Sequence, residues 1–288
     1  ANARDNAVPG VRLLSASEVS LLEPRIVAKA ALLVPSSGVI DAADYLGKLR
    51  ASSSCHNLDG TRVVNIDKVR DGFRLSTVSG GRKESFVAAA LINAAGLYAD
   101  DIARMLDDES PYRIMPVRGE AAKFYSNRRP ELAVSGMNIY PVPTAFYTES
   151  GEEAKLPFDE FTTLLARGEI IDTLGIHLTP TLDEDGSIAS TVTVGPSITT
   201  AVGKEDYGSN LHPPDYYRQR VAHFFPSLRP GDLHLHQAGI QARLACHPDW
   251  IIEADAKHSR CIHLIGIDSP GLTASLAIGE RVAELLQA

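Results

Sequence analysis

Residues Cys261–Glu280, CIHLIGIDSPGLTASLAIGE, join a strand pattern to a helix pattern within twenty residues. This stretch begins with an alternating apolar run that predicts a buried strand, and it ends with apolar residues at helical spacing. Between the two runs, Asp268 or Ser269 can cap a helix, and Pro270 suits the first helical position. Gly271 lets a ligand approach the backbone closely. The stretch therefore predicts a strand, a tight turn and a helix whose free amides could hold an anionic or electron-rich group, or simply an ordinary capped turn.

The apolar positions of this predicted helix share one face. They are Leu272, Leu276, Gly279, Val282 and Leu286.

Composition and charge limit the class of protein. The 288 residues are 44% hydrophobic and 22% charged, which is typical of a globular chain with one large domain or two ordinary ones. The net charge of −8 argues against a nucleic-acid surface. The longest apolar stretch, Phe86–Ala99, is interrupted and too short to cross a bilayer, so no transmembrane segment is predicted. Cys55, Cys246 and Cys261 lack metal or disulfide spacing, which fits a reducing compartment.

A second strand and helix precede the middle of the chain. The run Ala88–Gly96 is continuously apolar and predicts a strand buried on both faces, followed by a helix at Ala99–Leu106. Small residues, Ala94, Ala95 and Gly96, end the run. They could let a ligand touch backbone at the end of a parallel strand, or they could only allow close packing of helix on strand.

The remaining patterns divide the chain. We expect a connecting segment at residues 1–40, parts of one α/β domain at 41–106 and 236–288, and an antiparallel domain at 107–235. Within the α/β part, Asp41 predicts a helix cap, and residues 61–88 predict a three-stranded meander. The segment 146–170 predicts a mainly helical surface insertion, and Tyr216–Phe225 predicts a helix ended by Pro226.

A few polar residues within apolar patterns could carry chemistry. His177 lies in a predicted strand, on the face opposite Ile176 and Leu178, and could be a general base or a structural histidine. Tyr140 could line a pocket or belong to the core. Arg118 and Arg243 could bind a substrate carboxylate or form salt bridges. His234 and His236 have no recognisable third ligand, so no metal site is predicted.

Seven segments in order along the chain resemble one family: the FAD-dependent oxidoreductases of the D-amino-acid oxidase superfamily, and within it the L-2-hydroxyglutarate dehydrogenase/oxidase branch. These segments are Pro35–Asp41, Ile92–Leu97, Val117–Glu120, Ile139–Pro143, Leu174–Thr179, Val192–Pro196 and Gly266–Ile278.

The resemblance implies roles for individual residues. Ala94, Ala95 and Gly96 would lie against the adenosine half of FAD. His177 would take the hydroxyl proton of an L-2-hydroxy acid while the α-hydrogen leaves as hydride to the flavin. Tyr140 and Thr179 would share its pocket in the antiparallel domain. The turn beside the isoalloxazine would comprise Gly266, Ser269, Pro270, Gly271, Leu272 and Thr273.

The resemblance also implies a setting. The partner would be a small 2-hydroxy acid, most plausibly L-2-hydroxyglutarate, with the electron acceptor left open. The compartment would be intracellular: mitochondrial for a eukaryotic protein and cytoplasmic for a bacterial one. An amino acid or glycerol 3-phosphate as substrate, and a truncated chain without catalysis, are the alternatives.

Two departures from the family pattern bear on these expectations. The family opens with a Gly-x-Gly-x-x-Gly turn that cradles the FAD pyrophosphate, and this sequence has none, so we expect the first βαβ unit of a Rossmann-like domain to be absent. Gln241 stands where the family has an arginine after Gly239-Ile240. Arg243 follows two residues later on the same strand face, so Gln241 and Arg243 are both candidates for the substrate site.

Overall fold

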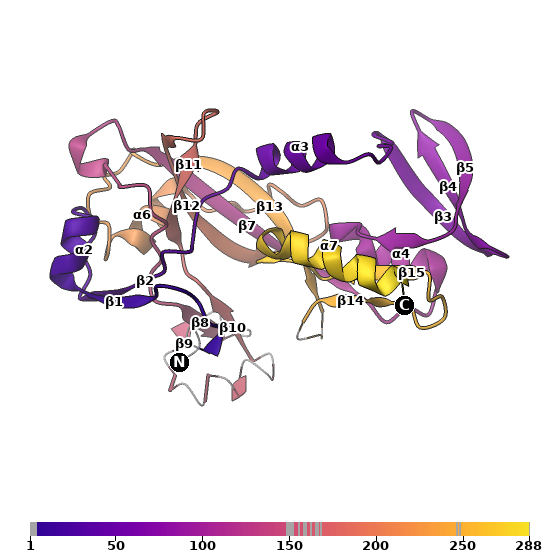
Figure 1. Ribbon diagram of the computed structural model, residues 1–288. Coiled ribbons are helices and arrows are strands. Elements are labelled where there is room, and N and C mark those ends of the chain that lie inside the picture. Colours follow the sequence, from indigo (N-terminus) through magenta and orange to yellow (C-terminus); the bar gives the residue numbers. More distant parts are fainter. Residues whose placement is uncertain are drawn as a thin grey trace. The chain divides into compact units, whose positions relative to one another are not determined.

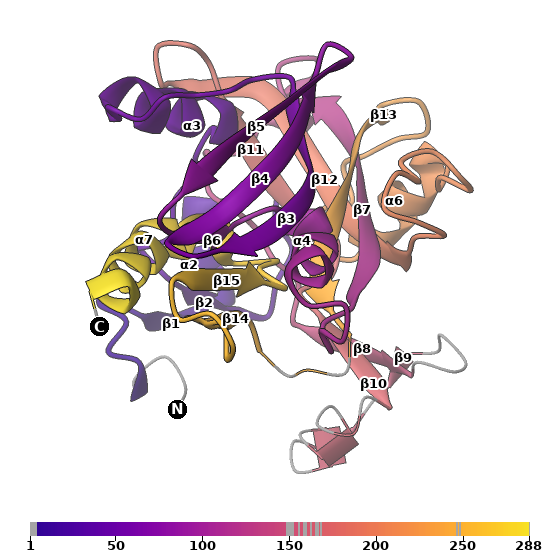
Figure 2. The same ribbon diagram turned by 90° about the vertical axis from the view of Figure 1, so that its right-hand side faces the viewer.

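A computed structural model of the chain describes residues 5–147, 153–154, 156–157, 160–161, 163–164, 167, 169–245, 247 and 249–287 (Figures 1 and 2). It divides into two compact units. Unit 1 comprises residues 1–47, 119–198 and 208–239, and unit 2 comprises residues 48–118, 199–207 and 240–288. The chain therefore passes between the units at 47/48, 118/119, 198/199, 207/208 and 239/240, and the domain division at 40/41, 106/107 and 235/236 stays a prediction. The fold is mixed α/β with antiparallel sheets, as the sequence predicted.

Unit 1 opens with a small hairpin and a capped helix. Strands β1 (Arg12–Ser15) and β2 (Ala30–Leu33) pair antiparallel around helix α2 (Ala16–Leu22). Ser15 accepts a hydrogen bond from the Glu18 amide, while the Glu18 side chain accepts one from the Ser15 amide. This capping box holds the first turn of α2 without help from distant residues.

The main sheet has the order β11-β12-β7-β13. Its strands are β7 (Ile114–Tyr125), β11 (His177–Leu182), β12 (Ile188–Thr200) and β13 (His234–Leu244). Three of them, β7, β12 and β13, run on into residues of unit 2. Strands β11 and β12 are antiparallel, joined by a turn at Asp183–Gly186.

The core of unit 1 lies between this sheet and helix α6 (Pro214–Val221). Phe124, Leu178 and Val194 from the sheet and Tyr217 and Phe225 around the helix are fully buried. Helix α6 begins two residues before the predicted start because Pro214 suits the first helical turn, and it ends at Val221 rather than before Pro226.

The inserted segment of unit 1 contains strands where we expected mainly helix. Strands β8 (Thr144–Tyr147), β9 (Glu153–Ala154) and β10 (Ile170–Thr173) form a sheet of order β10-β8-β9 with its own small core. Residues 160–161 and 163–164 are helical. Residues 156–157, 167 and 169 of the predicted insertion belong to no helix or strand, and its remaining residues lie outside the described part of the chain. A short 3₁₀ turn, η2 (Pro130–Leu132), precedes this segment.

Unit 2 contains the predicted meander. Strands β3 (Thr61–Val69), β4 (Gly72–Ser79) and β5 (Arg82–Ala88) form an antiparallel sheet in chain order (Figure 2). Helix α3 (Ala42–Ser52) comes before it. The Asp44 amide donates to the Asp41 carboxylate over 2.8 Å, so the predicted cap is confirmed.

A second sheet of unit 2 has the order β14-β15-β6. It contains β6 (Leu91–Asn93), β14 (Ile251–Ala254) and β15 (Cys261–Ile265), with β15 parallel to β6 and antiparallel to β14. Strand β6 continues through the 3₁₀ turn η1 (Gly96–Tyr98) into helix α4 (Ala99–Leu106).

The prediction of one long strand at Ala88–Gly96, buried on both faces, was wrong. Ala88 ends β5, the chain bends at the next two residues, and β6 is only three residues long. Ile92 is 45% exposed. The alanine-rich run therefore contributes residues to strands of two different sheets. An apolar pattern alone cannot distinguish this arrangement from one long strand.

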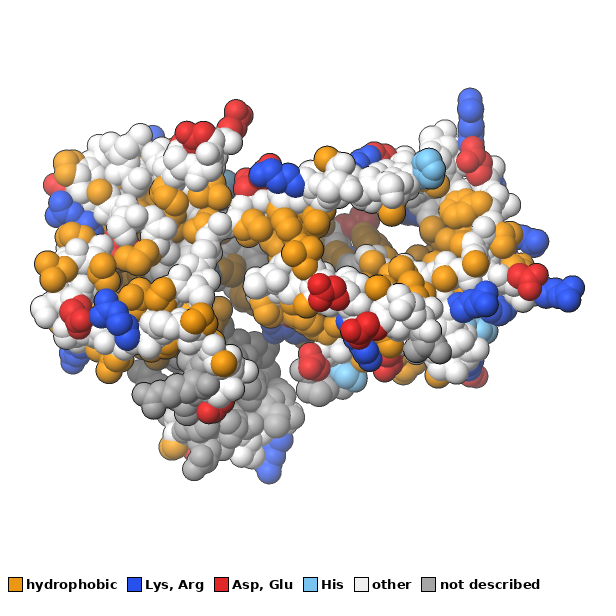
Figure 3. All heavy atoms as spheres, viewed as in Figure 1, with side chains coloured by type: hydrophobic (Ala, Val, Ile, Leu, Met, Phe, Trp, Pro, Cys, Tyr) orange, Lys and Arg blue, Asp and Glu red, His pale blue; other side chains and the backbone are white. Residues whose placement is uncertain are grey.

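Helix α7 (Gly271–Gln287) packs against β14 and β15. Of its predicted apolar face only Val282 is buried, together with Gly271 at the start of the helix. Leu272, Leu276 and Leu286 are 40%, 62% and 42% exposed, and hydrophobic side chains reach the surface in this region (Figure 3). No helix in the described part of the chain is long and apolar enough to cross a membrane.

Candidate active site

The predicted site residues fall into two groups, one in each unit. His177, Tyr140 and Thr179 belong to unit 1, and the predicted cofactor residues belong to unit 2 with Arg118, Gln241 and Arg243.

Tyr140 and His177 meet because the chain before β8 pairs with the start of β11. Ile139 and Leu178 exchange two backbone hydrogen bonds of 3.0 Å, which brings the neighbouring side chains together. The two rings stack with centroids 4.1 Å apart and planes inclined by 29°. Thr179 lies two residues beyond His177 in β11, on the same strand face. The structure thus brings together all three residues predicted for the substrate pocket.

The hydrogen bonding of His177 defines its tautomer. Its Nδ1 lies 2.9 Å from the carbonyl oxygen of Gly175, and because a carbonyl only accepts, Nδ1 carries the proton. Nε2 is then the unprotonated nitrogen, and no described residue hydrogen-bonds to it. Burial lowers the pKa of His177 below 6.5, against a smaller opposing effect of the Gly175 bond. His177 is therefore a neutral base with a defined free lone pair.

Gly175 holds this arrangement through its backbone. Its φ of +73° is a conformation that side chains disfavour, and an added Cβ would lie 2.7 Å from Cγ of Pro141. Gly175 also lies in the break between β10 and β11. Pro141 directly follows Tyr140 in the chain. The backbone of Gly175 therefore determines both where its carbonyl points toward His177 and how closely the Tyr140 ring approaches the imidazole.

In unit 2 the two predicted cofactor turns leave the same edge of a sheet. Strands β6 and β15 are parallel, with His263 opposite Asn93, so the turns after both strands lie at their shared carboxyl ends. This is where open α/β sheets bind ligands. Ala94, Ala95 and Gly96 are exposed there, and Gly96 has a φ of +54°. The backbone of this turn is therefore accessible.

The second turn is shaped by close packing of two glycines. A Cβ on Gly266 would lie 2.6 Å from Cβ of Leu244, and one on Gly271 would lie 2.4 Å from Cγ2 of Ile267. Ser269, Pro270, Leu272 and Thr273 are exposed. The amides of Leu272 and Thr273 find no hydrogen-bond acceptor among the described residues, so the start of α7 presents free N–H groups at the surface.

The expected helix cap was wrong in detail. Helix α7 begins at Gly271, with Pro270 just before it, and the Ala274 amide donates to the Pro270 carbonyl. The Asp268 carboxylate does not cap the helix. It accepts hydrogen bonds from Nε of Arg243 at 3.2 Å and from the indole of Trp250 at 3.1 Å. Arg243 of β13 and Trp250, just before β14, therefore take up this carboxylate, and the amides of Leu272 and Thr273 stay free.

The three predicted carboxylate-binding residues have different surroundings. Arg118 is 3% exposed, and its Nη1 lies 3.2 Å from both the backbone and the side-chain oxygen of Asp206. Arg243 bonds Asp268 beside the second turn. Oε1 of Gln241 is buried without a hydrogen-bond partner among the described residues. Pairing with Asp206 supports a structural part for Arg118, and substrate binding by all three residues stays a prediction.

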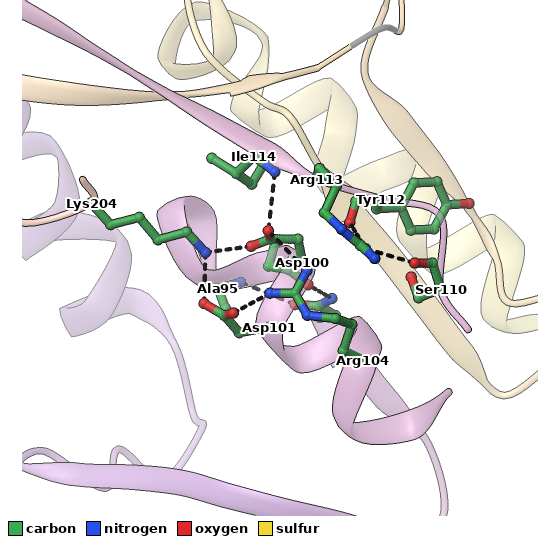
Figure 4. A network of polar contacts seen from close by, with 11 residues as sticks. Ala95, Asp100, Asp101, Arg104, Ser110, Tyr112, Arg113, Ile114 and Lys204 are labelled. Carbon is green, nitrogen blue, oxygen red and sulfur yellow. Dashed lines mark hydrogen bonds and ion pairs between the residues drawn. The ribbon is translucent and has the colours of Figure 1, made fainter. Parts of the chain in front are cut away.

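A charged network supports helix α4, which follows the first turn (Figure 4). Nζ of Lys204 lies 2.6 Å from a carboxylate oxygen of Asp100 and 2.6 Å from one of Asp101, and Arg104 pairs with both acids. Burial opposes ionisation of Asp100, yet hydrogen bonds from Lys204 and the Ile114 amide lower its pKa below 3.8. The sequence pattern did not predict this network. Two adjacent acids in a first helical turn were the available signal.

A second polar set, which the sequence did not predict, lies on the strands that lead into the two turns and beside them. Asn93 of β6 contacts His263 of β15, and His263 contacts Asp255. The available signal was one polar residue inside each of two apolar strands. In the described part of the chain, no group of three or more His, Cys, Asp or Glu side chains is placed to hold a metal ion.

Comparison with known proteins identifies the family. The profile of the family described as FAD dependent oxidoreductase (DAO) matches residues 1–285. The chain therefore belongs to this family of FAD-dependent oxidoreductases, and FAD is the cofactor of the family.

Similar proteins narrow the comparison. L-2-hydroxyglutarate dehydrogenase of Escherichia coli (strain K12) is 26% identical over 95% of this chain and 65% of its own length. The mitochondrial L-2-hydroxyglutarate dehydrogenase of Arabidopsis thaliana is 24% identical over 96% of this chain and 60% of its own. The chain thus spans a little under two thirds of the length of these relatives.

Solved structures agree on the fold. L-α-glycerophosphate oxidase of Mycoplasma pneumoniae with FAD bound has a TM-score of 0.68 at 23% identity, covering 96% of this chain and 65% of that one. Glycine oxidase of Geobacillus kaustophilus has a TM-score of 0.67 at 20% identity, covering 99% and 65%. At these identities the likeness concerns the fold alone.

Proposed function

We propose that this chain carries the substrate base and part of the FAD site of an enzyme that oxidises an L-2-hydroxy acid, most specifically L-2-hydroxyglutarate, to the 2-oxo acid. The observation that carries the proposal is the neutral His177 with its Nε2 free, stacked on Tyr140. The names of the relatives from bacteria and plants support the choice of substrate.

The cofactor turns fit a flavin. The exposed turn Ala94–Gly96 and the free amides of Leu272 and Thr273 lie at the carboxyl ends of two parallel strands. A 17-residue helix starting at those amides favours negative charge near its first turn, which suits the electron-rich edge of an isoalloxazine. Ala94, Ala95 and Gly96 would hold the adenosine half, and Gly266 and Ser269–Thr273 the ring system. FAD, when bound, supplies a two-electron acceptor for hydride.

The chain's own residues would perform the acid–base part of the reaction. Nε2 of His177 would accept the hydroxyl proton as the carbon–hydrogen electron pair leaves the substrate, and the Gly175 carbonyl would stabilise the resulting imidazolium through Nδ1–H. Tyr140 would cover one face of the imidazole, and Thr179 would offer a hydroxyl to the substrate. Arg243 offers the guanidinium for a substrate carboxylate.

The proposal is tested by an absorption titration of the purified chain. FAD is added first, and L-2-hydroxyglutarate is then added without oxygen. We expect a flavin band that sharpens on binding and bleaches with substrate. Free flavin that stays oxidised would contradict the proposal for this chain.

Other oxidations on the same fold are the second candidate. The structures with the same fold include oxidases named for glycerophosphate and for glycine. A panel of L-2-hydroxyglutarate, glycine and glycerol 3-phosphate separates the candidates, because an amine or a phosphate needs other partners than a hydroxy acid. A chain that binds FAD but reduces none of the panel would favour the alternative without catalysis.

A further inference from the structure

Three polar side chains form a buried chain of hydrogen bonds in unit 2. Asn93 and His263 are each 2% exposed, and they lie on the neighbouring strands β6 and β15. Nδ2 of Asn93 is 3.1 Å from Nδ1 of His263, and Nε2 of His263 is 3.2 Å from Oδ2 of Asp255. No role in the proposed reaction involves these residues. We call the chain Asp255–His263–Asn93 the polar relay.

The orientation of the Asn93 amide follows from its other two partners. Nδ2 lies 2.7 Å from the carbonyl oxygen of Ala99, which can only accept a hydrogen bond. Oδ1 lies 3.4 Å from the amide of Ala95, which can only donate one. Turning the amide over would place oxygen against oxygen and N–H against N–H. Nδ2 is therefore the atom that faces His263, and it donates.

The hydrogen bond from Nδ2 of Asn93 determines which ring nitrogen of His263 carries the proton. Nδ1 must accept from Asn93, so the proton of the neutral ring is on Nε2, where it donates to Asp255. The other groups around the ring are Cys261, with Sγ 3.9 Å from Nε2, and Tyr112, with ring centroids 6.0 Å apart. Burial raises the pKa of the Cys261 thiol to about 12, so Asp255 is the charged partner of the ring among these groups. Both nitrogens of His263 are thus used in holding neighbours.

The end of the relay controls the first cofactor turn. Asn93 immediately precedes Ala94. Its side chain accepts a hydrogen bond from the Ala95 amide at one end of the turn and donates one to the Ala99 carbonyl at the other. The Tyr98 amide donates to the Ala95 carbonyl across the same turn over 3.0 Å. Ala94, Ala95 and Gly96 are exposed, so these hydrogen bonds hold the exposed part of the turn, while Leu97 beyond it packs against the apolar core of unit 2.

We infer that the polar relay is a positioning device for the cofactor turn. Asp255 holds the proton of His263, His263 holds the amide of Asn93 in one orientation, and Asn93 holds Ala94–Gly96 in the conformation that meets the cofactor. His263 and Asn93 are positioning residues that touch neither substrate nor cofactor. The cofactor part of this inference rests on the proposed function, and the conformational part does not.

The first test reads the tautomer directly. Nitrogen NMR of the full chain labelled at histidine, with the signal of His263 assigned by its loss in H263Q, should show a neutral ring with the proton on Nε2 at pH 7. A ring with its proton on Nδ1, or a protonated ring, would overturn the relay because Nδ1 could then not accept from Asn93.

The second test reads the turn. In H263L and N93A we expect the amides of Ala95 and Tyr98 to exchange with solvent about tenfold faster, the equivalent of one lost hydrogen bond. Glutamine at position 263 offers one acceptor and one donor, so H263Q should keep exchange within about threefold of wild type. Equal exchange in wild type and H263L, or equal acceleration in H263Q and H263L, would overturn the inference.

A core variant serves as the matched control. Ile251 of β14 is 6% exposed in the apolar core of unit 2, so I251V lowers overall stability without removing a polar contact. It should leave exchange of Ala95 and Tyr98 under native conditions at the wild-type rate. Acceleration in I251V equal to that in H263L would mean that general loosening, and not the relay, governs the turn.

The third test connects the relay to the cofactor. In FAD titrations followed by flavin fluorescence, H263L and N93A should bind FAD about tenfold more weakly than wild type, and H263Q within about threefold. If wild type binds FAD and all variants bind it equally, the relay does not position the cofactor turn. If wild type binds no FAD, the proposed function fails for this chain, while the NMR and exchange tests still decide the relay.

Discussion

His177 and His263 show how two neutral histidines can have opposite uses. Both donate one ring proton to an oxygen of the chain: His177 to the Gly175 carbonyl, and His263 to Asp255. They differ at the other nitrogen. Nε2 of His177 has no partner among the described residues, while Nδ1 of His263 accepts from Asn93. The free nitrogen of His177 can take a proton from a bound substrate, whereas both ring nitrogens of His263 are occupied by buried groups of the chain itself.

Removal of the free Nε2 of His177 should have the greatest consequence for activity. In an enzyme that oxidises L-2-hydroxyglutarate, H177N should reduce the anaerobic rate of flavin reduction by about 10²- to 10⁴-fold, because the hydroxyl proton loses its acceptor. Stopped-flow absorbance measures that rate. H234Q, at an exposed histidine of β13, is the control and should keep the wild-type rate. A near-normal rate in H177N would exclude His177 as the base.

The second prediction concerns stability, and the larger loss should follow from replacing His263. H263L leaves Asn93 and Asp255 without their buried partner, so we expect the free energy of unfolding to fall by about 2–3 kcal/mol. H177L removes one hydrogen bond, to Gly175, and the ring stack on Tyr140, whose apolar contact leucine replaces in part, so it should cost about 1 kcal/mol. Urea unfolding of the two variants measures the difference. Equal losses would mean that the second hydrogen bond of His263 contributes nothing.

The pH dependence of the oxidation rate tests His177 as the base. Its unprotonated form is the one that accepts a proton, and burial places its pKa below 6.5. The oxidation rate should therefore be level at neutral pH and fall about tenfold per pH unit below that pKa. The lowered pKa also means that the unfolded chain binds more protons in this range, so stability falls as the pH decreases. A rate that falls as the pH increases through this range would contradict the role of a base.

Alanine substitutions at Gly175 and Gly186 should differ modestly in their cost to stability. G175A must place a side chain at a φ of +73° and 2.7 Å from Pro141, whereas G186A meets only a φ of +82°, with no atom within 4 Å of the added Cβ. We expect G175A to cost about 1–2 kcal/mol more stability than G186A. Only G175A should also lower the oxidation rate, because its carbonyl holds His177. Urea unfolding and the rate assay test both statements.

The sequence by itself determined the features that depend on near neighbours. Ser15 and Glu18 cap α2, Asp41 caps α3, and the turn at Asp183–Gly186 joins β11 to β12, since each of these bonds spans four residues or fewer. Alternation also placed His177 on the face opposite Leu178. The resemblance in Gly266–Ile278 and the other segments indicated the family before any contact was known.

Only the tertiary structure decided which polar group meets which. Asp268 could have capped α7, but Arg243 and Trp250 reach it first. Asn93 and His263 are 170 residues apart in sequence, and only the parallel pairing of β6 and β15 makes them partners. The tautomer of His177 likewise depends on where the Gly175 carbonyl points. Such choices follow from the direction of single hydrogen bonds across the fold, and residue type and spacing carry no information about that direction.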